Sequence, residues 1–357
     1  MSYERFEPVD CDGHVIEQID DMKSFMDEVV AHQAGRPALR HHNVFPNLDG
    51  AHFAIRRDPQ FRANRKNASD GMAGSPADWN AFLEKAKVKI SVLFPSEGLA
   101  IGMLNSPDYA ARLCRTYNDW VHDRFAQANP NLKPVALIPM QDPALAVKEL
   151  NRAVKDLGLV SAMLPSVGLP LHLGHSYYDP VYRAASDLGV PLCIHGGSSR
   201  NIGMESFTNY PARHALHHTL PLAVALVGVI YHGTMDRFPA LKLGFMEGGC
   251  GWLAFILDRM HRDVHYYDRA DLPQKAPEEY LGRGRILVGC EGSEETLGHV
   301  AKRIGIEAFA YASDYPHEVD LPHAIHEIEE VAEREDLSDD EKSRVLQGNA
   351  RAFFSLS

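Results

Sequence analysis

The chain has 357 residues, of which 45% are hydrophobic and 24% are charged, as expected for a globular protein with a large core. Its formal net charge of −12 argues against a nucleic-acid-binding surface, because such surfaces are basic. The five cysteines form no Cys-x-x-Cys pair, which excludes a cysteine-rich zinc knuckle and indicates free thiols in a reducing compartment.

The first ten residues lack the apolar stretch of a signal peptide. The most apolar run, residues 220–230, is shorter than a membrane span. We therefore expect a cytoplasmic protein that acts on a small molecule, with no nucleic acid and no membrane as partner.

Eight short β-type runs alternate with longer helical patterns, which is typical of a parallel α/β fold. The expected strands are 9–15, 88–94, 134–139, 159–164, 191–195, 241–247, 285–289 and 309–313. The expected helices are 108–129, 143–157, 178–188, 252–267 and 324–334.

Eight strands with helical crossovers predict a (β/α)8 TIM barrel. The structural alternative is a doubly wound sheet. It would need a glycine-rich phosphate loop after the first strand, and the sequence there, VDCDGHVIE, has none.

Three connections are long: 16–87, 196–213 and 264–284. The first two follow strands one and five, which places them at the C-terminal rim of a barrel, where catalytic loops lie. We expect one domain over 1–357, with 16–87 as a cap over the active site. That segment carries Arg56, Arg57, Arg62 and Arg65, which could bind a substrate carboxylate or could form a solvated basic stretch.

The first strand presents several polar side chains. Residues two apart in a strand face the same side, so Asp10, Asp12 and His14 are expected to share one face. Polar groups inside a barrel are costly unless they are paired or bind a metal. The alternative is a turn at the strand end with a solvated histidine.

Three further strands end in residues that can bind metals or transfer protons. His195 precedes two glycines, Glu247 precedes another pair, and Asp314 closes the last strand. Asp314 could ligate a metal or act as general base. The alternatives are a turn-capping histidine, a partly solvated glutamate and a helix-capping aspartate. Their shared position at strand ends favours a catalytic site.

The stretches VDCDGHVIE, CIHGG, GTMDRFPALKLGFMEGGCGWL, YASDYPHE and VLQGNARAFF resemble one known family. It is the amidohydrolase-related family typified by aminocarboxymuconate semialdehyde decarboxylase, within the amidohydrolase superfamily. The resemblance implies a (β/α)8 barrel with one divalent metal at the C-terminal rim, held by Asp12, His14, His195 and Asp314. Zinc is the expected ion, and manganese is the alternative because Asp12 makes the site harder. A homodimer is also implied.

Two positions depart from the family pattern. Asp12 stands where a histidine is common, and Glu247 stands where the decarboxylase has its acid/base histidine. The cluster 213–218 lies where related sequences place a histidine near the pocket, and we select His218. The expected catalytic residues are therefore Asp314, Glu247 and His218.

The leading hypothesis is a metal-dependent lyase or hydrolase for a small carboxylated substrate, aromatic or ring-derived, acting by non-oxidative decarboxylation. The alternative is a hydrolase that uses metal-activated water on a C–C, ester, lactone or amide bond. A third hypothesis is a barrel without catalytic activity that serves as a binding protein.

Overall fold

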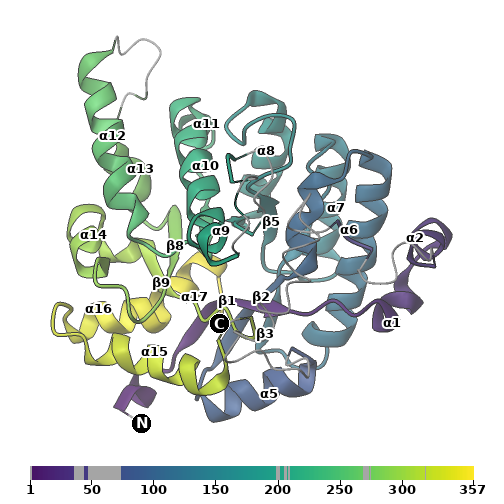
Figure 1. Ribbon diagram of the computed structural model, residues 1–357, viewed down its shortest axis with the longest axis horizontal. Coiled ribbons are helices and arrows are strands. Elements are labelled where there is room, and N and C mark those ends of the chain that lie inside the picture. The colour runs from purple at the N-terminus through teal and green to yellow at the C-terminus, as the bar shows by residue number, and fades with distance from the viewer. Residues whose placement is uncertain are drawn as a thin grey trace.

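The computed structural model describes residues 2–35, 44–46, 74–197, 202–204, 207, 210–267, 273, 275–317 and 319–357. Within these ranges, parallel strands form the centre of the molecule and helices surround them (Figure 1). The strands are β1 (Val9–Val15), β2 (Ile90–Pro95), β3 (Leu132–Pro134), β4 (Ala136–Leu137), β5 (Ala162–Pro165), β6 (Leu192–His195), β7 (Leu243–Met246), β8 (Ile286–Cys290) and β9 (Phe309–Tyr311).

The strands form two parallel sheets, in the orders β1-β2-β3 and β4-β5-β6-β7-β8-β9. Strands β3 and β4 are two parts of one barrel strand, interrupted at Val135. The Val135 N–H donates to the Leu93 carbonyl, at 2.9 Å. The next residue, Ala136, donates to Ser161, also at 2.9 Å. Counting β3 and β4 together, eight strands follow in chain order, as predicted.

The last strand meets the first just beyond its end. The Asp314 N–H donates to the Asp12 carbonyl, and the His14 N–H donates to the Tyr315 carbonyl, both at 2.8 Å. These bonds join the two sheets into the predicted (β/α)8 barrel. Every residue of β1 is buried, and so are those of β2, β6 and β7, because helices cover their outer faces.

Most helices lie on the outside of the strands. They are α1 (Ile19–Met22), α2 (Glu28–Ala34), α5 (Pro76–Lys85), α6 (Pro107–Val121), α7 (Pro143–Lys155), α8 (Asp179–Leu188), α9 (Tyr210–His217), α10 (Thr219–Tyr231), α11 (Thr234–Arg237), α12 (Trp252–Tyr266), α13 (Pro277–Leu281), α14 (Leu297–Ile304), α15 (Leu321–Glu333), α16 (Asp339–Ser343) and α17 (Asn349–Phe354). Local signals set their ends: the Asp142 side chain accepts from the Ala144 N–H at the start of α7, and Gly189 ends α8 at φ +70°.

The three long connections are more ordered than the sequence suggested. The first contains α1, α2 and α5, the second runs into α9, and the third contains α13. Helix α5 begins at a capping box formed by Ser75 and Asp78, with Pro76 in its first turn. These signals stand in the sequence but were missed. The four arginines of the expected cap lie outside the described residues.

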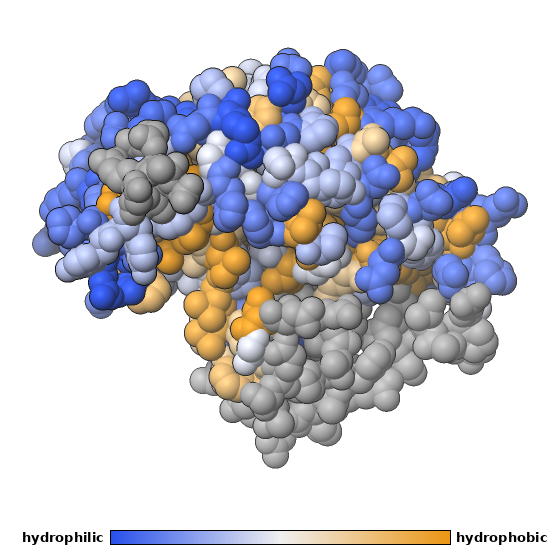
Figure 2. Space-filling model, turned by 90° about the horizontal axis from the view of Figure 1, so that it is seen from above, coloured by the Kyte–Doolittle hydropathy of each residue, from blue (hydrophilic) through white to orange (hydrophobic). Residues whose placement is uncertain are grey.

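Helices α9 and α10 correct a second expectation. Together they form a 21-residue run, Pro211–Tyr231, that is long and apolar enough to cross a membrane. The estimate from 220–230 was too short because the helix begins before the apolar residues. Half of the most apolar part of this run is buried inside the protein, as in a core helix. The upper face of the molecule is mostly hydrophilic, with a band of hydrophobic residues (Figure 2).

Asp10 fastens the junction between β9 and β1. Its carboxylate accepts from the Ser313 N–H and the Ser313 hydroxyl, both at 3.0 Å, and from the Asp12 N–H at 3.3 Å. Burial raises the pKa of this carboxyl to about 7. The pairing register of β1 shifts between Asp10 and Gly13. Asp10 therefore binds the segment that follows β9, and it holds Asp12 and His14 in place.

Replacing Asp10 by alanine should leave the buried Ser313 N–H without its acceptor, and we expect a loss of about 2–4 kcal/mol of unfolding free energy. Asp10→Asn keeps an acceptor for that N–H and an amide for the Ser313 hydroxyl, so it should cost under about 1.5 kcal/mol. Urea denaturation of both variants measures the difference. Equal losses in the two variants would contradict this role.

Candidate metal centre

Three of the four predicted ligands form a buried group at the C-terminal ends of β1 and β6. Asp12, His14 and His195 each contribute one atom, and these atoms all lie within 4.8 Å of one another. The His195 Nε2 atom is 3.3 Å from Asp12 Oδ1, and His14 Nε2 is 3.7 Å from the same oxygen. All three side chains are at most 1% exposed.

The fourth predicted ligand, Asp314, belongs to a second group that shares His14. This group also contains Glu247 and His317. Asp314 Oδ1 is 3.3 Å from His14 Nε2, and Glu247 Oε2 is 3.9 Å from that nitrogen. The structure thus brings Asp12, His14, His195 and Asp314 to one place and adds Glu247 and His317 to them.

The tautomer of His14 follows from its hydrogen bond. Its Nδ1 lies 3.0 Å from the Pro95 carbonyl, and a carbonyl can only accept, so Nδ1 carries the proton. Burial, together with His317 and His195, lowers the pKa of His14 well below its usual value, which keeps the ring neutral. Its Nε2 lone pair therefore faces carboxylate oxygens, which are also acceptors.

His195 adds a further acceptor: its Nδ1 lies 3.1 Å from the Gly196 carbonyl and so carries the proton, which leaves the Nε2 lone pair facing Asp12. His14 Nε2 and Asp12 Oδ2 are buried and have no hydrogen-bond partner among the described residues. Buried acceptors that face one another are unfavourable unless a proton or a cation lies between them. Imidazole nitrogen and carboxylate oxygen are ordinary ligands of zinc and manganese. The residues present therefore fit a divalent metal ion.

Backbone strain marks the two acids that end β7 and β9. Glu247 has φ +57° and Asp314 has φ +52°, in the left-handed region that side chains disfavour. Such a conformation costs on the order of 1–3 kcal/mol and persists only where the surroundings enforce it. Strain at both strand ends is a signal of function that sequence patterns cannot reveal.

Glu247 connects the metal-ligand group to His218. Its Oε1 is 3.2 Å from His218 Nε2, and its Oε2 is 3.5 Å from His195 Nδ1. His218 lies at the turn between α9 and α10 and packs directly on Gly196. A Cβ at Gly196 would lie only 2.6 Å from the His218 Cα, so a glycine is needed there. The two predicted catalytic residues are thus in contact.

His317 was not among the site residues predicted from the sequence. Its Nδ1 is 2.7 Å from Asp314 Oδ1, and its Nε2 is 2.7 Å from the Ser96 hydroxyl. Its ring also stacks on His14, with 3.9 Å between centroids. The only signal was its place in YASDYPHE, three residues after Asp314.

A buried glutamate, Glu17, positions Ser96, the residue whose hydroxyl contacts His317. Glu17 accepts from the backbone N–H groups of Ser96, Glu97 and Gly98 at 2.9–3.1 Å. It thereby fixes the loop that follows β2.

Comparison with known proteins agrees with this architecture. A family model described as amidohydrolase matches residues 9–356. The chain belongs to the amidohydrolase family. The family and the barrel expected from the motifs are therefore confirmed. The homodimer, the cytoplasmic location, the single-domain organisation and the cap at 16–87 stay predictions, as do the catalytic and metal-binding roles of the individual residues.

Two characterised relatives are decarboxylases. The gamma-resorcylate decarboxylase of Polaromonas sp. is 24% identical over 261 residues, which cover 70% of this chain and 78% of that protein. The 2-amino-3-carboxymuconate-6-semialdehyde decarboxylase of Dictyostelium discoideum is 25% identical over 77% of this chain and 75% of that protein.

Solved structures share the fold. An amidohydrolase from Mycobacterium avium subsp. paratuberculosis has a TM-score of 0.74 at 17% identity, covering 98% of this chain and 97% of that one. A dihydroxybenzoic acid decarboxylase from Polaromonas sp., solved with manganese and 2-nitroresorcinol, has a TM-score of 0.68 at 20% identity, with the same coverage.

Acidic groups also surround the back of the site. Burial, then the charges of Glu291, Glu330 and Asp314, raise the pKa of Glu327 on α15 to about 8. One of its oxygens, Oε2, is buried and has no partner among the described residues. Because the folded pKa exceeds the ordinary value of 4.5, Glu327 favours folding most below pH 4.5, and this contribution is lost as pH rises toward 8.

Replacing Glu327 by glutamine should remove that pH dependence. We expect similar stability of variant and wild type near pH 5, and a variant more stable by at least about 1 kcal/mol at pH 8.5. Unfolding free energies from urea titrations at several pH values measure this. A wild-type advantage at pH 8.5 would contradict the proposed cause.

Proposed function

We propose that this protein is a metal-dependent decarboxylase for a small aromatic carboxylic acid that carries a hydroxyl beside the carboxylate. The observation that carries the proposal is the buried acceptor group of Asp12, His14 and His195, next to Asp314 at the barrel rim. The named decarboxylases among its relatives support the reaction class.

Asp12, His14, His195 and Asp314 would hold the metal, as predicted from the sequence. A donor set with two carboxylates is hard, which favours Mn2+, and the relative solved with manganese supports that choice over the zinc first expected. When bound, the ion supplies Lewis-acid polarisation of the substrate's carboxylate and hydroxyl.

Proton transfer would fall to Asp314. In decarboxylation the bond between the ring carbon and the carboxylate breaks, CO2 leaves, and the ring carbon keeps the electron pair and takes a proton. Asp314 lies at the rim, 20% exposed, so its proton can be restored from solvent. His317, at 2.7 Å and anchored by Ser96, would orient the Asp314 carboxyl.

Glu247 would act as an anchor at the position where related decarboxylases have a histidine. His218 holds one oxygen of its carboxylate, so the other oxygen faces His195 and His14. Glu247 is 11% exposed against 20% for Asp314, and its oxygens face three histidines, so solvent can restore a proton to it less readily than to Asp314. We therefore assign it to orienting ligands, water or a substrate hydroxyl.

The manganese-loaded protein should release one CO2 for each product formed from 2,6-dihydroxybenzoate or 5-carboxyvanillate. The methyl esters of the same acids have no free carboxylate and should not react. Labelled water distinguishes the alternative, because hydrolysis places solvent oxygen in the product. Ester cleavage with label incorporation and no CO2 would establish a hydrolase instead.

Replacing His195 by alanine should remove most of the metal and lower kcat by at least about 100-fold. His299→Ala is the matched control, because His299 is an exposed histidine of α14. Elemental analysis and CO2 release measure both variants. Full metal retention in the His195 variant would remove His195 from the ligand set.

Glu247→Gln keeps the shape of the side chain and removes its charge. We expect kcat/KM to fall by about 100-fold, because the ligands and His218 lose the carboxylate that orients them. Glu333→Gln, an exposed substitution at the end of α15, should have no effect. Wild-type kcat/KM and metal content in the Glu247 variant would show that this residue is structural.

A further inference from the structure

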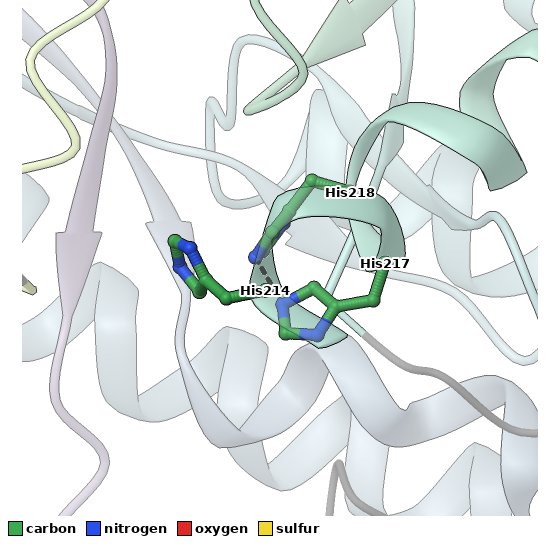
Figure 3. Close-up of side chains that lie close together, drawn as sticks. All are labelled: His214, His217 and His218. Carbon is green, nitrogen blue, oxygen red and sulfur yellow. Dashed lines mark hydrogen bonds between the residues drawn. The ribbon is translucent and has the colours of Figure 1, made fainter. Parts of the chain in front are cut away.

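A second histidine group lies beside the centre described above. His214, His217 and His218 are spaced i, i+3 and i+4, which puts them on one face of the helical turn. The rings of His217 and His218 meet, with the His214 ring beside them (Figure 3), and one ring nitrogen from each lies within 4.8 Å of the others. His217 is 5% exposed and His218 is 8% exposed, so the group is largely withdrawn from water.

The contact between two of these rings is unusual for a simple hydrogen bond. His217 Nε2 and His218 Nε2 are 2.5 Å apart, and only one proton can lie between them. The other nitrogen of His218, Nδ1, is buried and has no hydrogen-bond partner among the described residues. Two ring nitrogens directed at one point, with a third ring adjacent, form a nitrogen-rich donor set.

We propose that His214, His217 and His218 bind a second divalent metal ion, and that Glu247 bridges it to the ion held by Asp12, His14, His195 and Asp314. The bridge rests on the proposed first site. The three-histidine site itself does not depend on the reaction that the protein catalyses.

The geometry of Glu247 supports the bridge. One carboxylate oxygen is 3.2 Å from His218 Nε2, in the histidine group. The other oxygen is 3.9 Å from His14 Nε2, the nitrogen that faces the first group. A carboxylate shared in this way holds two ions about 3.5–4 Å apart in typical two-metal sites.

The two sites differ in the metal that they favour. Three imidazoles with one carboxylate form a borderline donor set that suits Zn2+, whereas the first site contains two further carboxylates and suits Mn2+. In a tetrahedral zinc site the ring nitrogens lie about 3.3 Å apart. The rings of His217 and His218 would therefore separate by about 0.8 Å from their present contact.

The test is metal stoichiometry. Wild-type protein, stripped of metal and reconstituted with Mn2+ and Zn2+ together, should bind about two equivalents. The double variant His214→Ala/His217→Ala should bind about one, with zinc lost preferentially. The double variant His323→Ala/His326→Ala removes two exposed histidines of α15 and should match wild type. Elemental analysis measures all three proteins.

A second measurement reports on the bridge. With Mn2+ alone, the wild type should show the electron paramagnetic resonance signal of a coupled ion pair, and the His214/His217 variant that of an isolated ion. An anomalous map of zinc-treated wild-type crystals should show a peak at the histidine group, and this decides the site even if the double variant fails to fold.

Saturation of the wild type at one equivalent would overturn the proposal, and so would two equivalents in the His214/His217 variant. Failure of the proposed function looks different. If the protein binds two ions but releases CO2 from none of the acids tested, the second site stands and the decarboxylase assignment falls.

Discussion

The site depends on one buried hydrogen bond, from His14 Nδ1 to the Pro95 carbonyl. This bond fixes the proton on the outer side of the ring and leaves the Nε2 lone pair facing Asp314 and Asp12. Burial reinforces it by keeping the imidazole neutral. The His14 nitrogen and the carboxylate oxygens, all hydrogen-bond acceptors, then face one another in a buried region. Only a cation or added protons between them can make this arrangement favourable.

The barrel supplies the rigidity that such a group needs. Asp10 ties β1 to the chain beyond β9, and Glu17 ties the loop after β2 through three backbone N–H groups. On β1 itself, Gly13 leaves room for the Trp79 ring, whose Nε1 donates to the His14 carbonyl at 3.1 Å. Each of these contacts lies one residue or a few residues from a ligand, so the ligands are held by bonds that do not use their own side chains.

Strands were predictable because their signal is simple. Buried parallel strands are typically continuous apolar runs, as in β8, Ile286–Cys290, which the sequence predicted at 285–289. Helix α10 was missed although its sequence is strongly apolar, because a helix that is apolar nearly all round shows no periodic pattern. Helix α5 was missed for a different reason. It lies in a long polar segment that was interpreted as a loop, although a clear capping box marks its start.

Most of the candidate site followed from residue type and strand position, whereas the remainder needed tertiary contacts. Asp12, His14, His195 and Asp314 could be selected because barrel strand ends converge at one rim. His317 could not, because its place beside Asp314 depends on the turn that follows β9 and on Ser96, 221 positions away in sequence. Asp10 was placed on the same face as Asp12 and His14, but its carboxylate binds Ser313, and the register of β1 shifts just after it.

The carboxylate of Glu247 changes the electrostatics of the whole rim. A neutral imidazole at this position would leave the charge of a divalent ion balanced by Asp12 and Asp314. Glu247 adds a negative charge at a strained strand end, close to both His195 and His218. A strained, partly buried carboxylate is unfavourable by itself, because both the backbone conformation and the desolvation oppose it. His195 and His218 each lie close to one of its oxygens, which links the β7 end to the histidine group at the end of α9.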